Sequence, residues 1–263
     1  MKNQKNYLGI LDWGIGGFGF FNAVKKKYPN IPILYFSDSG FIPYGKVNKI
    51  ELHNRIKSIL LRMKDLGAKQ ISVACHSAST VAKDILIEEV TVNTIYNSTG
   101  NYLTKVKSTN KAIGLIGGIA TIKSKMYSKF HDNLVEKPAQ SLSAFIEQGE
   151  INSLAVHEAV IKVIQELSIT GEISSLVLAC THYPAISNIF QQYLSNVEIV
   201  DPVNFMLLEM KNLLKSLEKQ EKSKSILKPK DVIFTTGDPS KLKKAAYKAF
   251  NINLDINDIV KLY

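Results

Sequence analysis

Short apolar runs alternate with segments of helical periodicity along almost the whole chain of 263 residues. Helices of the expected length fit between most of these runs, and this alternation predicts an α/β fold with mostly parallel strands. The runs that read as strands are YLGILDW at 7–13, IPILYFSD at 31–38, QISVAC at 70–75, AIGLIGG at 112–118, SLVLAC at 175–180, VEIVDP at 197–202 and DVIFTTGD at 231–238.

Both cysteines of the chain, Cys75 and Cys180, end a predicted strand and are followed by polar residues at 76–77 and 181–182. A buried cysteine is usually a small apolar core residue, but a core strand would normally continue with apolar residues. Ligands of open α/β sheets bind beyond the carboxyl ends of the strands, where free backbone N–H groups can hold a carboxylate. The pattern therefore predicts that both thiols face one ligand cleft.

The repeated motif predicts two similar α/β domains with mostly parallel sheets and the active site in the cleft between them. A chain of this length has enough apolar material for two modest cores. We expect the first domain to comprise residues 1–98 and 208–263, and the second to comprise residues 99–207. The last stretch of the chain would then rejoin the first domain.

A glycine-rich segment, GIGGFG at 14–19, directly follows Asp12 at the end of the first predicted strand. It matches the dinucleotide-binding fingerprint poorly, because the acidic residue precedes the glycines and no ribose-binding acid follows at the usual distance. We interpret it as a tight turn that lets the chain pass close to a ligand. Metal is not expected either, since CH at 75–76 and CTH at 180–182 lack the spacing of a structural zinc site.

The charge of the chain does not indicate a nucleic-acid partner. Its net charge is +10, yet only Arg55 and Arg62 of its 33 basic residues are arginines. Arginine supplies the forked donors that clamp phosphates and read bases, whereas scattered lysines are typical of solvated faces. No apolar run is long enough to cross a bilayer and no signal peptide is evident, so we expect a cytoplasmic protein without a membrane partner.

The sequence resembles the glutamate racemases, within the aspartate/glutamate racemase superfamily. The matching segments occur in family order and cover nearly the whole chain, and ACTHYP and TTGDP are the most specific of them. They are GILDWGIGG, IPILYFSDSGFIPYGK, ISVACHSAST, IGLIGGIATIKSKMY, FIEQGEI, LVLACTHYP, VEIVDP and FTTGDPSKLKK.

The resemblance implies an isomerase that interconverts L- and D-glutamate without a cofactor and supplies D-glutamate for peptidoglycan, and hence for cell-wall biogenesis and cell shape. One cysteine would remove the α-proton and the other would return a proton to the opposite face, with Asp12 serving Cys75, and with Glu147 and His182 serving Cys180. Cysteine suits both roles because its pKa lies near neutrality and shifts readily. The resemblance also implies a substrate pocket formed by Asp12, Trp13, Pro43, Tyr44, Gly45, His76, Ser77, Thr181 and His182. A homodimer and an interaction with DNA gyrase would follow from the resemblance alone.

Three residues depart from the family pattern: Trp13 replaces serine, His76 replaces asparagine and Ser77 replaces threonine. An imidazole at His76 could form an ion pair with the Cys75 thiolate, or it could point away and only fill space. These departures leave two alternatives to glutamate racemisation. One is a superfamily relative acting on aspartate or on a dicarboxylate, as an isomerase or decarboxylase, and the other is a non-catalytic binding or regulatory homologue.

Overall fold

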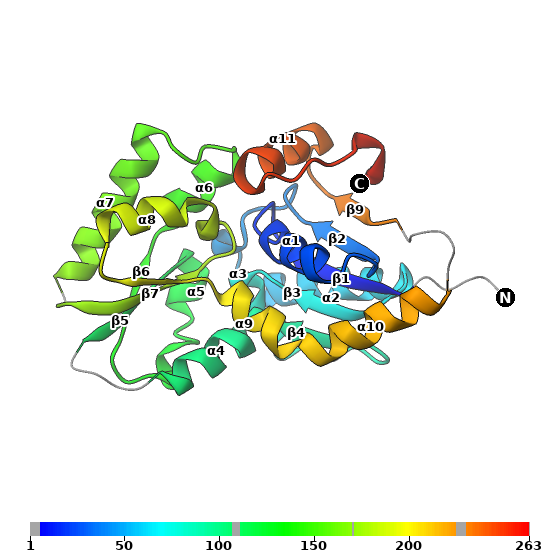
Figure 1. Ribbon diagram of the computed structural model, residues 1–263, viewed down its shortest axis with the longest axis horizontal. Helices are drawn as coiled ribbons and strands as arrows, with labels where there is room; N and C mark the ends of the chain where they lie inside the picture. Colours follow the sequence, from blue (N-terminus) through cyan, green and yellow to red (C-terminus); the bar gives the residue numbers. More distant parts are fainter. Residues whose placement is uncertain (1–5, 107–110, 170, 225–229, 263) are drawn as a thin grey trace.

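Two parallel sheets form the framework of the protein in a computed structural model, which describes residues 6–106, 111–169, 171–224 and 230–262 (Figure 1). The larger sheet has the strand order β10-β9-β2-β1-β3-β4, and all of its registered strand pairs are parallel. Its strands are β1 (Tyr7–Asp12), β2 (Ile33–Ser37), β3 (Ala68–Val73), β4 (Thr91–Thr94), β9 (Val232–Thr235) and β10 (Ile259–Lys261).

The smaller sheet has the strand order β6-β5-β7-β8, again with every registered pair parallel. It contains β5 (Ala112–Gly117), β6 (Leu134–Pro138), β7 (Ile173–Ala179) and β8 (Glu198–Val200). The α/β class with two parallel sheets is therefore confirmed. The residues at which one domain passes into the other, near 98 and 208, stay a prediction.

Helices cover both sheets, because each crossover between parallel strands places a helix on a sheet face. In Figure 1, α7 and α8 lie on one side of the smaller sheet and α4 lies on the other. The helices are α1 (Phe18–Lys27), α2 (Lys49–Asp65), α3 (His76–Ala82), α4 (Ile95–Lys105), α5 (Ile119–Lys123), α6 (Gln140–Glu147), α7 (Leu154–Ser168), α8 (Ser187–Tyr193), α9 (Pro202–Glu209), α10 (Lys211–Lys224) and α11 (Pro239–Phe250). Single 3-10 turns are η1 (Tyr44–Lys46), η2 (Ser128–Phe130), η3 (Tyr183–Ile186) and η4 (Ile256–Asp258).

One continuous apolar cluster joins the two halves. It contains Leu8 and Ile10 of β1 as well as Leu176 and Leu178 of β7, all of them buried. Burial of this much apolar surface is the main favourable term in folding. The strands β1 and β7, one from each sheet, thus share a single core.

Two segments differ from the sequence-based expectation. The helix expected over 79–89 begins earlier, at His76, and ends at Ala82, because Cys75 caps it and accepts a hydrogen bond from the Ala78 backbone N–H. The helix expected over 121–134 stops at Lys123, and Lys125 then adopts the left-handed conformation, with φ of 53°. A helix cannot continue through such a residue. In the part of the chain that the structure describes, no helix is long and apolar enough to span a membrane.

Candidate active site

A cavity of about 90 Å³ lies where the carboxyl ends of the two sheets meet, and both Cys75 and Cys180 line it. Cys75 follows β3 and Cys180 follows β7, so the two thiols come from different sheets. The remaining residues that we expected at the substrate also line the cavity, namely Asp12, Trp13, Pro43, Tyr44, Gly45, His76, Ser77, Thr181 and His182. Glu147 does not line it and instead lies behind His182.

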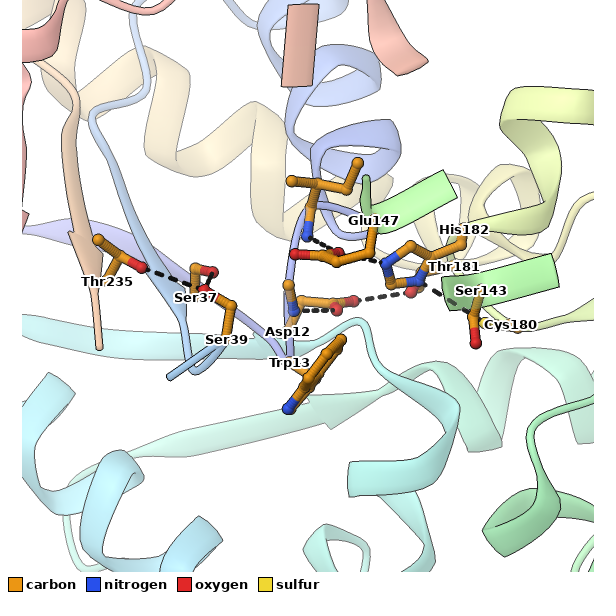
Figure 2. A network of polar contacts seen from close by, with 12 residues as sticks. Asp12, Trp13, Ser37, Ser39, Ser143, Glu147, Cys180, Thr181, His182 and Thr235 are labelled. Carbon is orange, nitrogen blue, oxygen red and sulfur yellow. Dashed lines mark hydrogen bonds and ion pairs between the residues drawn. The ribbon is translucent and has the colours of Figure 1, made fainter. Parts of the chain in front are cut away.

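Sequence reasoning missed a group of lining residues on the side of the smaller sheet. They are Gly118, Gln140, Ser143, Ala144 and Ala179. Three of them lie on α6, which follows β6, a strand whose sequence LVEKP lacks a run of apolar residues. Ser143 is labelled beside Cys180 in Figure 2. The signal that could have found them is the hydroxyl- and amide-rich QSLS segment at the start of a helix that follows a strand.

Cys75 is a buried thiol at the first turn of α3. Its side chain is 8% exposed, and its Sγ accepts a long hydrogen bond of 3.5 Å from the Ala78 backbone N–H. Burial raises the pKa of Cys75 well above its usual value, and the nearby carboxylate of Asp12 raises it further. Both effects disfavour a negative charge on this sulfur. At neutral pH the Cys75 side chain therefore carries its proton.

Cys180 has a different environment, because an imidazole stands beside it (Figure 2). His182 Nδ1 lies 3.7 Å from Cys180 Sγ, and His182 Nε2 lies 2.6 Å from Glu147 Oε2. Burial alone lowers the pKa of His182, but its hydrogen bonds to Cys180 and Glu147 outweigh this effect and raise the pKa well above the ordinary value. A positively charged imidazolium stabilises negative charge on an adjacent sulfur.

Asp12 joins the two halves of the site. It is completely buried; its Oδ1 accepts a hydrogen bond of 3.1 Å from the Gly14 backbone N–H, and its Oδ2 accepts one of 2.8 Å from Thr181 Oγ1. Burial raises the pKa of Asp12, and this effect outweighs the opposing attraction of His182. The carboxyl group at the end of β1 thus fixes the residue that follows Cys180.

The glycine-rich turn passes close to protein side chains rather than lying open to a ligand. A Cβ at Gly14 would lie 2.2 Å from Glu147 Oε2, and one at Gly16 would lie 2.2 Å from Thr181 Oγ1. The Ile15 backbone N–H also donates to Glu147 Oε2 over 3.0 Å. Only glycine permits this approach, so the turn seats Glu147 and Thr181 against the end of β1.

The imidazole of His76 bonds to the opposite half of the molecule and not to Cys75. His76 Nδ1 lies 2.7 Å from the Tyr127 hydroxyl, and burial lowers the pKa of His76 to about 3. Of the two arrangements considered for His76, the ring that points away from Cys75 is the one observed, and it forms no ion pair because it is neutral at physiological pH. Its Nε2 is buried and has no hydrogen-bond partner among the described residues.

The indole of Trp13 is held in place by a hydrogen bond. Its Nε1 donates to the Phe41 carbonyl over 3.1 Å, while its ring lines the cavity. The ring also packs against the apolar cluster of the larger sheet. Trp13 is thus both a core residue and part of the cavity wall.

Tyr44, on the same wall, is fixed by a buried ionic network. Its hydroxyl donates to Asp38 Oδ2 over 2.8 Å, and Arg55 Nε donates to the same oxygen over 3.0 Å. Asp38 is completely buried, and its Oδ1 also accepts a bond of 3.0 Å from Thr236 Oγ1. Such charge-assisted bonds restrict geometry strongly, so η1 forms a rigid part of the wall.

Both cysteines are free thiols, and among the residues that the structure describes no cluster of three or more His, Cys, Asp or Glu side chains could hold a metal ion. The polar groups that line the cavity are thus two thiols, hydroxyls, the Gln140 amide, the neutral imidazole of His76, Asp12 and His182, and Glu147 contacts His182 from behind. This set can transfer protons from two directions.

Comparison with known proteins identifies the class to which this fold and site belong. The glutamate racemase of Francisella tularensis superposes with a TM-score of 0.85 at 23% identity, covering 99% of this chain and 98% of that one. A Bacillus anthracis glutamate racemase isoform gives a TM-score of 0.84, also at 23% identity, with 99% and 98% covered. These likenesses show the shared fold.

Sequence similarity narrows the class to a family. The glutamate racemase of Aquifex pyrophilus is 31% identical over 213 residues, which are 79% of this chain and 83% of that protein. The glutamate racemase of Thermoanaerobacter sp. strain X514 is 28% identical over 246 residues, 91% of each chain. No model of a protein family matches the sequence. The chain belongs to the glutamate racemase family.

Proposed function

We propose that this protein is a cofactor-independent glutamate racemase that interconverts L- and D-glutamate with Cys75 and Cys180 as the two bases. The observation that carries this proposal is the pair of free thiols, from different sheets, on one small cavity. The relatives named above are glutamate racemases, and the Francisella tularensis structure contains D-glutamate. A racemase needs one base and one acid on opposite faces of the α-carbon.

The two environments assign a starting state to the pair. The imidazolium of His182 lies 3.7 Å from Cys180 Sγ, which favours Cys180 as the first base, whereas burial keeps Cys75 protonated. Cys180 would then remove the α-proton from one face of the substrate, and Cys75 would donate its proton to the other face. The C–H bond breaks, a new C–H bond forms and the two sulfurs exchange protonation states. The return of a proton to the opposite sulfur completes the cycle.

The residues around the thiols support this exchange by orientation and charge. Glu147 holds the His182 ring through the 2.6 Å contact at Nε2, so that Nδ1 faces Cys180. Asp12 holds Thr181 through its hydroxyl. Asp12, Glu147 and His182 are accordingly positioning or proton-handling groups, and Ser77 and Thr181 are candidate substrate ligands.

Heavy water provides the test. Purified protein incubated with L- or D-glutamate in D₂O should exchange the α-proton with solvent while the optical rotation falls to zero. Cys75→Ser and Cys180→Ser variants should each lose racemisation, because each removes one of the two proton carriers. Failure of exchange with glutamate, or a single variant that racemises like the wild type, would overturn the assignment.

A shorter acidic substrate is the second candidate, because the indole of Trp13, where the family has serine, forms part of the wall of the cavity. The aspartate racemase of Picrophilus torridus shares the fold, with a TM-score of 0.57 at 19% identity, and 82% of this chain and 94% of that one are covered. The same exchange assay with aspartate, and with dicarboxylates that lack an amino group, distinguishes glutamate from these other acidic substrates. Exchange with aspartate but not with glutamate would replace the proposed substrate.

The cellular role proposed here is the cytoplasmic supply of D-glutamate for peptidoglycan. Its support is membership of the family together with a free amino acid as the proposed substrate. A homodimer is part of the same proposal and can be tested by sedimentation. The gyrase interaction rests on family resemblance alone, and a supercoiling assay with added protein would test it.

A further inference from the structure

A second and larger cavity, of about 740 Å³, lies directly beside the catalytic cavity. Tyr44 and Gly45 line both, so η1 is the wall between them. Five lysines line the larger cavity, and none of its lining residues is Asp or Glu. We call it the lysine groove, defined by Lys46, Lys49, Lys83, Lys123 and Lys129.

The lysines come from separate parts of the chain. Lys46 ends η1 and Lys49 begins α2, whereas Lys123 ends α5 and Lys129 lies in η2. The groove is therefore bounded by elements associated with both sheets. Lys83 follows α3, the helix that begins immediately after Cys75.

Most of these ammonium groups lack a carboxylate partner. Across the described ranges, Lys46, Lys49, Lys123 and Lys129 form no ion pair within 4.0 Å, and Lys83 pairs only with its exposed neighbour Asp84 at 2.7 Å. Lysines elsewhere do find partners, as in the pairs Lys25–Asp231 at 3.1 Å and Lys125–Glu136 at 3.3 Å. The groove is distinguished by five lysines that line one concave surface together with no Asp or Glu.

Two of the ammonium groups converge on one ring. Lys83 Nζ lies 5.8 Å and Lys129 Nζ lies 5.6 Å from the centroid of Tyr96, which also lines the groove. The aromatic face offers each of them only a weak attraction at an exposed site. Like charges gathered around a concave surface repel one another and attract small anions from solution.

We propose that the lysine groove is a binding site for a small oxyanion, a carboxylate or phosphate compound, on the outer side of the Tyr44–Gly45 wall. The ligand would bridge lysines on both sides of the groove and neutralise their repulsion. Two sources have this chemistry: the acidic substrate, gathered before it enters the catalytic cavity, and a phosphorylated small molecule that remains in the groove.

The shared wall connects this site to the reaction. A Cβ at Gly45 would lie 3.2 Å from Gln140 Oε1, and Gln140 itself lines the catalytic cavity and accepts a bond of 3.0 Å from the Ile119 backbone N–H. We infer that an anion held by Lys46, the residue after Gly45, alters this contact beside the catalytic cavity and with it glutamate turnover. This effect on glutamate turnover rests on the proposed racemase function, whereas the binding of the anion does not.

The test compares two doubly neutralised variants with the same change of net charge. Lys46→Gln/Lys123→Gln removes one charge from each side of the groove, and neither residue lines the catalytic cavity. Lys243→Gln/Lys244→Gln is the matched control, because both lysines line a different surface cavity beside α11. Pyrophosphate at low salt is the probe, and its binding is measured by calorimetry.

Wild type and control should bind pyrophosphate alike, and the groove variant should bind it about tenfold more weakly. Equal binding by all three proteins, or no binding to the wild type, would overturn the proposal. Glutamate that displaces pyrophosphate competitively identifies the substrate as the occupant, and pyrophosphate retained at saturating glutamate identifies a phosphorylated ligand. If the protein binds pyrophosphate through these lysines but does not exchange the α-proton of glutamate, the proposed racemase function is wrong and the anion site in the lysine groove is supported.

Discussion

Substitution of His76 by asparagine should remove a specific part of the acid sensitivity of the fold. The His76 ring is 2% exposed, and its pKa is lowered from 6.5 to about 3 because burial penalises the charged form. In the unfolded chain the ring takes up a proton near pH 6.5, but in the folded protein it does so only near pH 3. The unfolded state therefore binds more protons between these values, and the free energy of unfolding falls as the pH drops through this window.

The size of the effect follows from the width of the window. Each pH unit below about 6.5 lowers the free energy of unfolding by about 1.4 kcal/mol for one such group. Between about pH 7 and about pH 4.5, the free energy of unfolding should fall by about 3 kcal/mol more in the wild type than in the His76→Asn variant. For a chain of this size that corresponds to roughly 6–12 °C in Tm.

Urea unfolding of both proteins at the two pH values measures this difference. The asparagine variant removes the bond from the His76 ring to the Tyr127 hydroxyl, which costs about 0.5–1.5 kcal/mol at either pH, so only the change with pH is diagnostic. Tyr127→Phe is the control, because it removes the same hydrogen bond but retains the imidazole. It should keep the acid sensitivity of the wild type. Parallel pH dependences for wild type and His76→Asn would refute the buried, neutral ring.

Two other substitutions probe the packing around the cavity. Arg55→Met should lower the free energy of unfolding by about 2–3 kcal/mol and raise the KM for glutamate, since it removes the cationic partner of the buried Asp38 carboxylate. Arg62→Met should change neither quantity, and equal denaturation midpoints for the two variants would contradict this role. Gly16→Ala should reduce kcat at least tenfold in the racemase assay because its Cβ would displace Thr181, and unchanged kcat would show that this contact is dispensable.

The framework of the fold was predictable because parallel strands buried on both faces are almost continuously apolar. β1, β5 and β7 are of this kind, and their runs of apolar residues indicate them in the sequence. β6 was not predicted, since its sequence LVEKP is only partly buried at the edge of the smaller sheet. β10 was also missed, because two of its three residues are exposed. Such edge strands depend on pairing with a neighbour, which the sequence does not display.

The placement of the candidate site residues has a similar limit. The motifs indicated that Cys75 and Cys180 end strands, and the family resemblance pointed to Asp12, Glu147 and His182. The contact of Asp12 with Thr181 joins residues 169 positions apart, and no local pattern predicts it. The partner of His76 was unpredictable for the same reason, because Tyr127 lies beyond a helix that ends earlier than its sequence suggests.

The difference between the two thiols is a property of the fold and not of the motifs. In the sequence each cysteine ends an apolar strand and is followed closely by a histidine, at position 76 after Cys75 and at position 182 after Cys180. One histidine is neutral because it is buried beside Tyr127, and the other is charged because Glu147 and the Cys180 sulfur hold its proton. Two cysteines can carry protons in both directions of a racemisation only if they can exchange their protonation states. The unequal surroundings therefore distinguish the two sides of the cavity, with a charged imidazolium beside Cys180 and a neutral imidazole after Cys75.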